Sequence, residues 1–195
     1  MIERVVGIVL KSVPYKESSN IVSVYTRELG LRSFIIKGGR GKKAPTKSSL
    51  FQPLQILNIE TYIGKSELLQ VKEANLFCNI NNIHTDIVKS SLAFFIIEVI
   101  LLSLKGEQAD VRTYSFFYDT VLALNEKENK ELKDFHLFFL YDFAKLLGFE
   151  PPDLSPHTSN KKERNDRLSL FLDFYHQHIT NQREIKSQEI LRLIL

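Results

Sequence analysis

The stretch that decides the fold of the first part of this chain is residues 5–37, VVGIVLKSVPYKESSNIVSVYTRELGLRSFIIK. Its apolar and alternating runs predict β-strands at Val5–Lys11, Ile21–Arg27 and Leu31–Lys37. The turn Glu28-Leu29-Gly30 joins the last two runs, and its glycine can take the positive φ of a tight hairpin. The stretch therefore predicts an antiparallel sheet close to the N-terminus.

Two further runs of the same kind follow, at Leu54–Tyr62 and Leu68–Glu73, with a glycine-containing turn at Gly64-Lys65-Ser66 between them. Five strands within about eighty residues favour a closed five-stranded antiparallel barrel such as the OB-fold, because closing the sheet also protects its edges. An SH3-like barrel is the alternative.

After residue 80 the apolar spacing becomes helical. It predicts helices near 85–104, 110–125, 130–147 and 165–180, and a last one from about 184. Gly148 stands where a helix C-terminal glycine belongs, Pro151-Pro152 prevents continuation, and the polar residues up to Arg164 predict an exposed loop. We therefore expect an α+β protein, with an OB-fold barrel in residues 1–80 and an all-helical domain in residues 81–195.

Composition excludes several classes of protein. Apolar residues make up 44% of the chain and charged residues 25%, as in ordinary soluble globular proteins. The single cysteine, Cys78, permits neither an internal disulfide nor a cysteine zinc site, which fits a reducing cytosol. The most apolar segment, residues 92–104, is interrupted by Glu98 and is shorter than the roughly twenty residues that a bilayer demands, so we expect no membrane association. The five histidines are scattered and no catalytic motif stands out, so we expect neither an enzyme nor a bound cofactor or metal.

Positive charge is concentrated at the start of the chain. Residues 1–50 hold ten Lys or Arg against three acids, a net charge of +7, whereas the remaining residues carry a net −4. Such asymmetry predicts a directed electrostatic face and a polyanionic partner, with nucleic acid as the first candidate.

The sharpest single feature is the segment KGGRGKKAPTKS, Lys37 to Ser48, with five cations, three glycines and no acid. It is not a nucleotide-binding P-loop, because Ile36 stands where the first glycine would be and Lys43 where Ser or Thr would be. On an OB-fold, a long cationic loop helps to bind oligonucleotides while aromatic residues stack on bases. The predicted DNA-binding residues are Arg32, Lys37, Arg40, Lys42, Lys43 and Lys47, and the candidates for stacking are Tyr15, Tyr25, Phe34 and Tyr62.

The order of several short motifs resembles the N-terminal domain of the RecO family of bacterial recombination mediators. The matching motifs are Gly7-Ile8-Val9-Leu10, Tyr15 with Glu17, Tyr25-Thr26 followed by Gly30, Lys37-Gly38-Gly39-Arg40 and Phe51-Gln52-Pro53. The resemblance extends more loosely through Ile97-Glu98 to Leu146-Leu147-Gly148-Phe149. It implies an OB-fold, a helical C-terminal domain, binding of single- and double-stranded DNA, strand annealing, and loading of RecA onto strands coated by single-stranded-DNA-binding protein (SSB).

The resemblance also implies protein partners, namely RecR, SSB and in some cases RecF, in the cytoplasm at the nucleoid. By the same resemblance we expect the helical domain to bind the acidic, apolar-ended tail of SSB, with Arg112 and Lys145 as candidate residues. Many family members carry a four-cysteine zinc module after the proline pair, where this chain has DLSPHTSNKKERNDR, so zinc is expected to be absent. The final run, Glu189 to Leu195, has no polar tail, which indicates either a missing terminal portion or a firmly docked helix.

A second interpretation remains open from the residues alone. A non-catalytic protein-interaction subunit with an OB- or SH3-like barrel would carry the same basic loop merely as a solvated surface. Titration with labelled single-stranded DNA at two salt concentrations separates the two interpretations.

Overall fold

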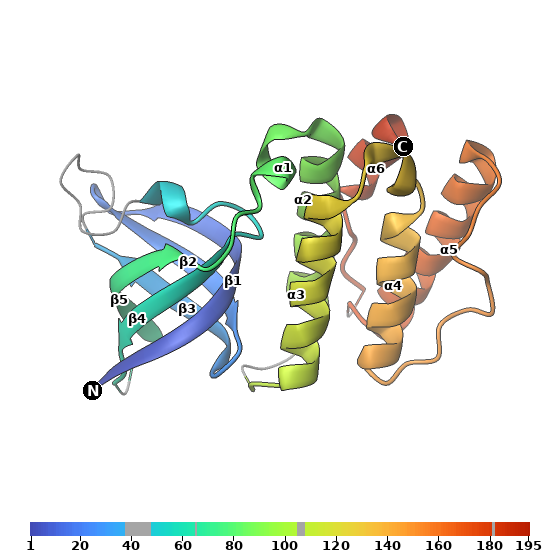
Figure 1. The fold of residues 1–195 in the computed structure, drawn as a ribbon. Helices are drawn as coiled ribbons and strands as arrows, with labels where there is room; N and C mark the ends of the chain where they lie inside the picture. Colours follow the sequence, from blue (N-terminus) through green and yellow to red (C-terminus); the bar gives the residue numbers. More distant parts are fainter. Residues whose placement is uncertain (38–47, 65, 105–107, 181) are drawn as a thin grey trace. The chain divides into compact units, whose positions relative to one another are not determined.

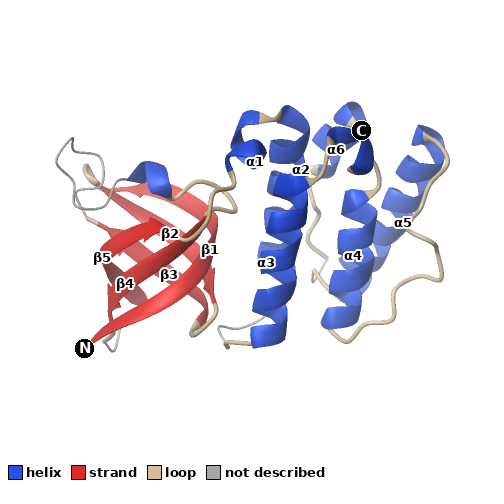
Figure 2. Ribbon diagram, viewed as in Figure 1, coloured by secondary structure: helices blue, strands red, loops and turns tan. Residues whose placement is uncertain are grey.

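The computed structural model describes residues 1–37, 48–64, 66–104, 108–180 and 182–195. Five strands come first and helices follow (Figures 1 and 2). The chain divides into two compact units, the first comprising residues 1–80 with 105–121 and the second residues 81–104 with 122–195.

The strands are β1 (Ile2–Tyr15), β2 (Ser19–Thr26), β3 (Gly30–Ile36), β4 (Ile56–Tyr62) and β5 (Leu68–Leu76). The helices are α1 (Asn81–Thr85), α2 (Ile87–Ser103), α3 (Val111–Glu126), α4 (Phe135–Leu146), α5 (Lys161–His178) and α6 (Gln188–Ile194), with 3-10 turns η1 (Ser48–Leu50) and η2 (Asn129–Glu131).

The five strands close into a barrel in the order β1-β2-β3-β5-β4, with β4 pairing back onto β1. All pairs are antiparallel except β3 with β5, which run parallel. This Greek-key order is that of the OB-fold, so the OB-fold prediction is confirmed over the SH3-like alternative. Alternate residues of the strands point inward and form the barrel core, which includes Val9, Val22, Phe34 and Leu57.

The hairpin turn between β2 and β3 forms as the sequence predicts. Gly30 has φ +71, and the Thr26 hydroxyl accepts a hydrogen bond from Leu29 N and donates one to Gly30 O. Gly64, in contrast, does not have a positive φ. The fourth strand begins at Ile56 rather than at Leu54, because Leu54 takes φ +61 in a turn where its N–H bonds to Val9 O.

The first strand is longer than the sequence predicts. It continues past Lys11 to Tyr15, after a bulge between Val9 and Lys11. Pairing with β4 ends at Ile8, so among the described residues the last part of β1 pairs only with β2, along one of its sides. An unpaired side tolerates Pro14, which has no N–H to donate.

The second unit packs the helices around α2, whose apolar residues are largely buried. Asp86 caps the N-terminus of α2 by accepting hydrogen bonds from Val88 N and Lys89 N. Glu98, the acid within this apolar helix, accepts hydrogen bonds from Lys186 N and Ser187 N at the start of α6. The carboxylate thus satisfies backbone donors at the N-terminus of a second helix. Among the described residues, no helix is both long and apolar enough to cross a membrane.

Helix boundaries differ from the predictions where local capping intervenes. The predicted helix 130–147 begins only at Phe135, because residues 129–131 form a 3-10 turn closed by reciprocal bonds between Glu128 and Glu131. This helix ends as predicted: Gly148 has φ +84, and Phe149 N bonds to Ala144 O. A short separate helix, α1, precedes α2, and α5 begins at Lys161, four residues before the predicted start.

The connection between α4 and α5 is not the fully exposed loop that the sequence predicts. Thr158 is buried, and its N–H and hydroxyl donate to the Asp134 carboxylate at 3.0 and 2.5 Å. Lys133 Nζ donates to Thr158 O at 3.0 Å. No cysteine lies in this connection, and side-chain hydrogen bonds fasten it to the start of α4.

Candidate nucleic-acid interface

The outer surface of the second half of β1, β2 and β3 forms a face on which cations flank an apolar row. We call it the cationic face. Strand register places Val13 opposite Ile21, and Ile21 opposite Ile35, so these three side chains form a row across the strands. The cationic face comprises Lys11, Val13, Tyr15, Lys16, Ile21, Ser23, Ser33, Ile35 and Lys37.

The neighbouring part of the same outer surface is covered. Tyr25, whose side chain points outward in the same alternation as Ile21, is only 3% exposed and meets the ring of Phe117 from α3 edge-on, with centroids 5.1 Å apart. The first half of α3 belongs to the same compact unit as the barrel. Within the described residues of the first unit, the helix therefore occupies one end of this surface and does not cover Val13 or Tyr15.

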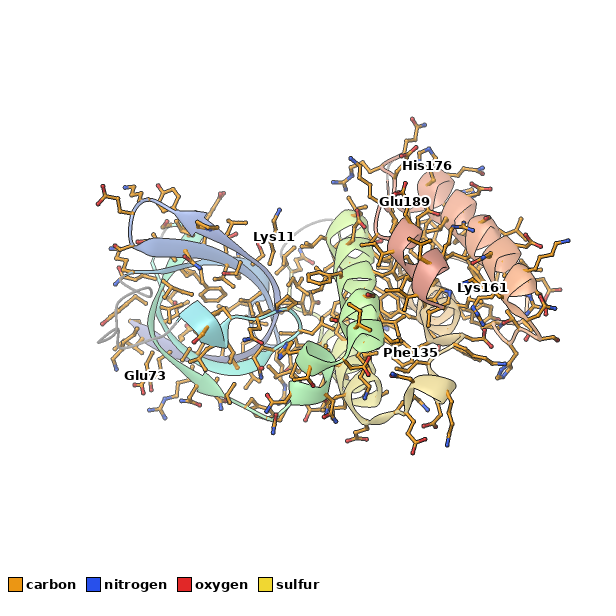
Figure 3. All side chains as sticks on the ribbon, turned by 90° about the horizontal axis from the view of Figure 1, so that it is seen from above. Lys11, Glu73, Phe135, Lys161, His176 and Glu189 are labelled. Atoms are coloured by element: carbon orange, nitrogen blue, oxygen red, sulfur yellow. The ribbon has the colours of Figure 1, made fainter. Side chains whose placement is uncertain are left out.

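Tyr15 gives the cationic face an exposed aromatic ring. Tyr15 and Val13 are each 37% exposed, and Lys16 Nζ lies 5.3 Å from the centroid of the Tyr15 ring. A ring beside a cation suits an exposed nucleobase next to a phosphate. In the side-chain view, Lys11 and Glu73 mark two different sides of the barrel (Figure 3).

The predicted DNA-binding residues fall into three groups. Lys37 is exposed and directly follows β3, at the end of the cationic face. Arg32 lies near the other end of β3 and shares the inward alternation of Phe34 and Ile36, so it does not join Lys37 on one path. It lines a cavity of about 220 Å³ with residues of the β4–β5 connection, including Ile63 and Glu67. Arg40, Lys42, Lys43 and Lys47 lie outside the described residues.

Of the four aromatic candidates for base stacking, two belong to the interior. Phe34 is fully buried in the barrel core, and Tyr25 is covered by α3. Tyr62 is exposed but lies on β4, beyond the cationic face. Of the four, Tyr15 is the exposed ring on the cationic face, beside Lys16, whereas Tyr62 lies near Lys72. Sequence reasoning missed the part played by Lys11, Val13 and Ile35, which the register reveals.

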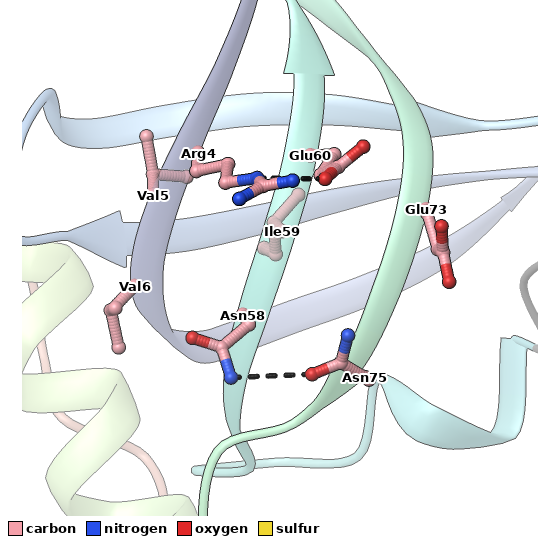
Figure 4. Close-up of a pocket in the computed structure, with 8 residues that line it drawn as sticks. All are labelled: Arg4, Val5, Val6, Asn58, Ile59, Glu60, Glu73 and Asn75. Carbon is pink, nitrogen blue, oxygen red and sulfur yellow. Dashed lines mark hydrogen bonds and ion pairs between the residues drawn. The ribbon is translucent and has the colours of Figure 1, made fainter.

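The outer surface of β1, β4 and β5 has a different character, and we call it the ion-paired face. Glu60 accepts a hydrogen bond from Arg4 Nε at 2.8 Å, and Asn58 Nδ2 donates to Asn75 Oδ1 at 3.2 Å (Figure 4). Lys72 Nζ donates a second hydrogen bond to Glu60, at 2.9 Å. Lys72 and then Arg4 hold the pKa of the Glu60 carboxyl below its ordinary value. Arg4, Asn58, Glu60, Glu73 and Asn75 are among the residues that line a cavity of about 380 Å³, in which one cation stands with two acids.

The two residues expected to bind a partner belong to different compact units. Arg112 is exposed at the start of α3, 3.5 Å from the Asp110 carboxylate, and belongs to the first unit. Lys145 belongs to the second unit, where its Nζ lies 4.4 Å from the centroid of the Tyr141 ring.

A different group of residues in the second unit combines cations with an apolar floor. A cavity of about 490 Å³, which we call the α4 pocket, has Phe135 and Phe138 beneath three lysines. Phe138 meets the His157 ring edge-on, with centroids 4.7 Å apart, and Phe135 is labelled in Figure 3. The residues lining the α4 pocket are Lys127, Lys130, Glu131, Lys133, Asp134, Phe135, Phe138 and His157.

Neither unit offers a metal centre within its described residues, where no group of three His, Cys, Asp or Glu side chains is placed to hold an ion. His136 is buried; burial, and then the charge of Arg164, lower its pKa to about 3, so it is a neutral core residue. Cys78 is partly buried, and burial raises the pKa of its thiol. Neither residue has the surroundings of a reactive group.

The fold places this chain among proteins that join an OB-fold barrel to a helical part. Comparison with known sequences narrows this class. The family model described as Recombination protein O N terminal matches residues 1–79, and the one described as Recombination protein O C terminal matches residues 84–183. The chain therefore belongs to the RecO family.

Curated relatives agree with this assignment. Proteins named DNA repair protein RecO from Phocaeicola vulgatus and Bacteroides fragilis are 35% and 34% identical over 152 residues, which is 77% of this chain. Those matches span 63% and 62% of the relatives' own length. A protein of the same name from Flavobacterium johnsoniae is 29% identical over 231 aligned positions, covering 96% of this chain and 97% of the relative.

Proposed function

We propose that this chain is a non-enzymatic DNA-binding mediator of DNA repair that acts in the cytoplasm at the nucleoid. The observation that carries the proposal is the cationic face, an OB-fold surface on which Lys11, Lys16 and Lys37 flank an apolar row and an exposed tyrosine. OB-folds bind oligonucleotides across strands 2 and 3. Relatives named for DNA repair support the same function.

In the proposed binding mode, the affinity for DNA does not depend on the base sequence. Lysines along the face neutralise phosphates, and Tyr15 with the row Val13, Ile21 and Ile35 contacts the flat faces of bases. The loop cations Arg40, Lys42, Lys43 and Lys47 continue the path from Lys37 along the sequence, as the composition of this segment predicts. Neither kind of contact reads base edges, so binding to single strands should be largely independent of sequence.

The test is a titration with labelled single-stranded DNA at several salt concentrations. Replacing Arg40, Lys42 and Lys43 by glutamine should flatten the slope of log affinity against log salt by roughly two, because each neutralised phosphate of a single strand contributes about 0.7. The matched control replaces Lys161, Lys162 and Lys186, three exposed lysines of the second unit, and should leave the slope unchanged. A wild-type protein that binds no DNA at low salt would instead favour the protein-interaction subunit.

We further propose that the annealing and RecA-loading activities implied by the family depend on this DNA binding together with RecR, SSB and, indirectly, RecF. Annealing of complementary strands by the wild type and by the loop triple variant tests the first step. Equal annealing rates at a salt concentration that abolishes DNA binding by the variant would separate annealing from the cationic face.

For the acidic tail of SSB, the α4 pocket is a better candidate than Arg112 and Lys145. An apolar side chain fits over Phe135 and Phe138 while the rim lysines meet carboxylates. In the free protein, acids already engage all three of these lysines: Lys127 lies 3.7 Å from Glu131, Lys130 lies 2.7 Å from Glu128, and Lys133 lies 3.9 Å from Asp134. An acidic peptide must therefore compete with Glu128 and Glu131.

Because the peptide competes with these acids, removing a rim lysine and removing a competing acid should change the peptide affinity in opposite directions. In calorimetry with an acidic, phenylalanine-ended peptide, Lys127→Gln should weaken binding and Glu131→Gln should strengthen it, each by a few-fold because the pairs are exposed. Arg112→Gln and Lys145→Gln serve as the comparison. A loss of heat only in those two variants would restore the sequence-based assignment and remove the α4 pocket from consideration.

A further inference from the structure

A groove between the first half of α3 and the barrel, within the first compact unit, plays no part in the functions proposed above. We call it the α3 groove. It has a volume of about 360 Å³, which is within the range of ligand pockets. Its lining residues are Val6, Arg27, Phe77, Val111, Tyr114, Ser115, Tyr118 and Asp119.

The walls of the α3 groove are aromatic and partly uncovered. Tyr118 stacks on Tyr114 with an interplanar angle of 26°, and the Phe77 ring meets Tyr118 edge-on, with centroids 6.2 Å apart in each pair. Phe77 is 45% exposed and Val111 is 56% exposed. Tyrosine, phenylalanine and arginine gathered around exposed apolar surface are the composition of protein-binding sites rather than of ordinary surface.

Polar groups of the α3 groove also lack partners. The Tyr114 hydroxyl is buried and has no hydrogen-bond partner within the described part of the chain. The side chains of Arg27, on the barrel wall, and Asp119, on the helix wall, are likewise unpaired among the described residues. A buried donor without a partner calls for an acceptor from outside, such as water or a bound molecule.

The electrostatic balance of the α3 groove is negative. Glu28, whose carboxylate accepts a hydrogen bond from Val6 N, adds its charge to that of Asp119, against the single cation Arg27. Burial first, and then the charge of Glu28, raise the pKa of Tyr114, and the opposing influence of Arg27 is smaller. Phosphate would therefore be repelled, and a cation would be attracted.

We propose that the α3 groove binds a segment of a partner protein in which an apolar anchor residue stands beside a lysine or arginine. The anchor lies between Phe77 and Tyr118, the basic residue faces Asp119, and a backbone carbonyl of the segment accepts from the Tyr114 hydroxyl. DNA on the cationic face and a protein segment in the α3 groove then occupy surfaces of opposite charge on one unit.

The test uses the full chain and two short capped peptides, Lys-Phe-Leu-Lys and Glu-Phe-Leu-Glu, followed by the NMR signals of the aromatic rings. The basic peptide should shift the ring protons of Phe77, Tyr114 and Tyr118, and the acidic peptide should bind more weakly. Asp119→Lys should weaken the basic peptide roughly fivefold, since it replaces an attraction by a repulsion at an exposed site. Asp166→Lys on α5 makes the same charge change at an exposed position far along the chain and should have no effect.

Tyr118→Ala should weaken the basic peptide roughly tenfold, because it removes a wall of the anchor site. Three results would overturn the proposal: no shift of these rings at millimolar peptide, equal affinity for both peptides, or the same shifts with a short thymidine oligonucleotide. The last result would make the groove part of a DNA path instead. Because Asp119 lies on the surface, its variant remains informative even if Tyr118→Ala fails to fold.

Discussion

The two outer faces of the barrel are built from the same kind of strand but differ in whether carboxylates stand beside their cations. On the ion-paired face, Glu60 pairs with both Arg4 and Lys72, and Glu73 adds a second carboxylate, so that acids balance the two cations. On the cationic face, Lys11 and Lys37 stand beside apolar residues, and the strands contribute no acid to the surface between them. Cation number alone would not distinguish the faces; the difference lies in where the carboxylates are.

This comparison explains how a protein with a net charge of only +3 can present a surface suited to the proposed nucleic-acid binding. Phosphate attraction depends on local potential, which a neighbouring carboxylate cancels at short range. Polar side chains of the ion-paired face also hydrogen-bond to one another, as Asn58 does with Asn75. Each prediction below therefore changes one face and uses the other as its control.

The largest effect is expected from placing acids on the cationic face. Ile21→Glu with Ile35→Glu adds two carboxylates in the middle of the apolar row, where both side chains are partly exposed. Repulsion of phosphates should cost about 2–3 kcal/mol, or roughly 30- to 150-fold in affinity for single-stranded DNA at low salt. Asn58→Glu with Asn75→Glu is the control on the ion-paired face. Equal losses from both pairs would show that only net charge matters.

A smaller loss is expected from removing the exposed ring. Tyr15→Ala should weaken binding by about 1–3 kcal/mol if one base stacks on the ring. Tyr62→Ala removes a ring of similar exposure from β4 and should leave affinity unchanged. Fluorescence titration at one salt concentration measures both variants. If Tyr62→Ala costs as much as Tyr15→Ala, the strand of DNA crosses the barrel outside the cationic face.

The cations of the cationic face should mainly affect how the affinity for DNA depends on salt concentration. Lys11→Gln with Lys37→Gln should flatten the salt slope by about 1.4, two contributions of about 0.7. Arg4→Gln with Lys72→Gln makes the same charge change on the ion-paired face and should leave the slope nearly unaltered, because Glu60 and Glu73 together balance those two cations. A flattened slope in the second variant would contradict the comparison directly.

Local sequence patterns predicted much of the fold but not the register. Alternation in β2 and β3 and the glycines Gly30 and Gly148 gave strands, a turn and a helix end that the structure confirms. The end of β1 was missed, because Pro14 normally breaks a strand and only pairing shows that, among the described residues, this part of the strand pairs with β2 alone. Leu54 was assigned to a strand because its apolar side chain fits one, although its backbone takes a turn conformation.

The candidate site was harder to predict because it depends on which side of a strand each residue faces. Arg32 and Lys37 are near in sequence, but an odd separation along a strand places them on opposite sides. The row of Val13, Ile21 and Ile35 comes from three strands, and only their pairing brings it together. Counting the charges in the sequence likewise does not reveal that Glu60 pairs with both Arg4 and Lys72.

The smallest effect, and the sharpest test of the comparison, comes from removing the acid that neutralises the ion-paired face. Glu60→Gln keeps the size and hydrogen-bonding capacity of the side chain but leaves Arg4 and Lys72 without that carboxylate. If carboxylate placement alone separates the faces, this variant should acquire weak additional DNA binding at low salt, with a salt slope steeper by at most about 1.4 for two newly available cations. Because Lys72 and Arg4 lower the pKa of Glu60, its pairing stabilises the fold above the ordinary glutamate pKa, and this contribution disappears as pH falls through the lowered value. Melting temperatures of wild type and variant should therefore differ slightly at neutral pH and converge in acid. A variant that shows the convergence but gains no DNA binding would mean that the shape and apolar row of the cationic face, rather than the absence of acids, determine where DNA binds.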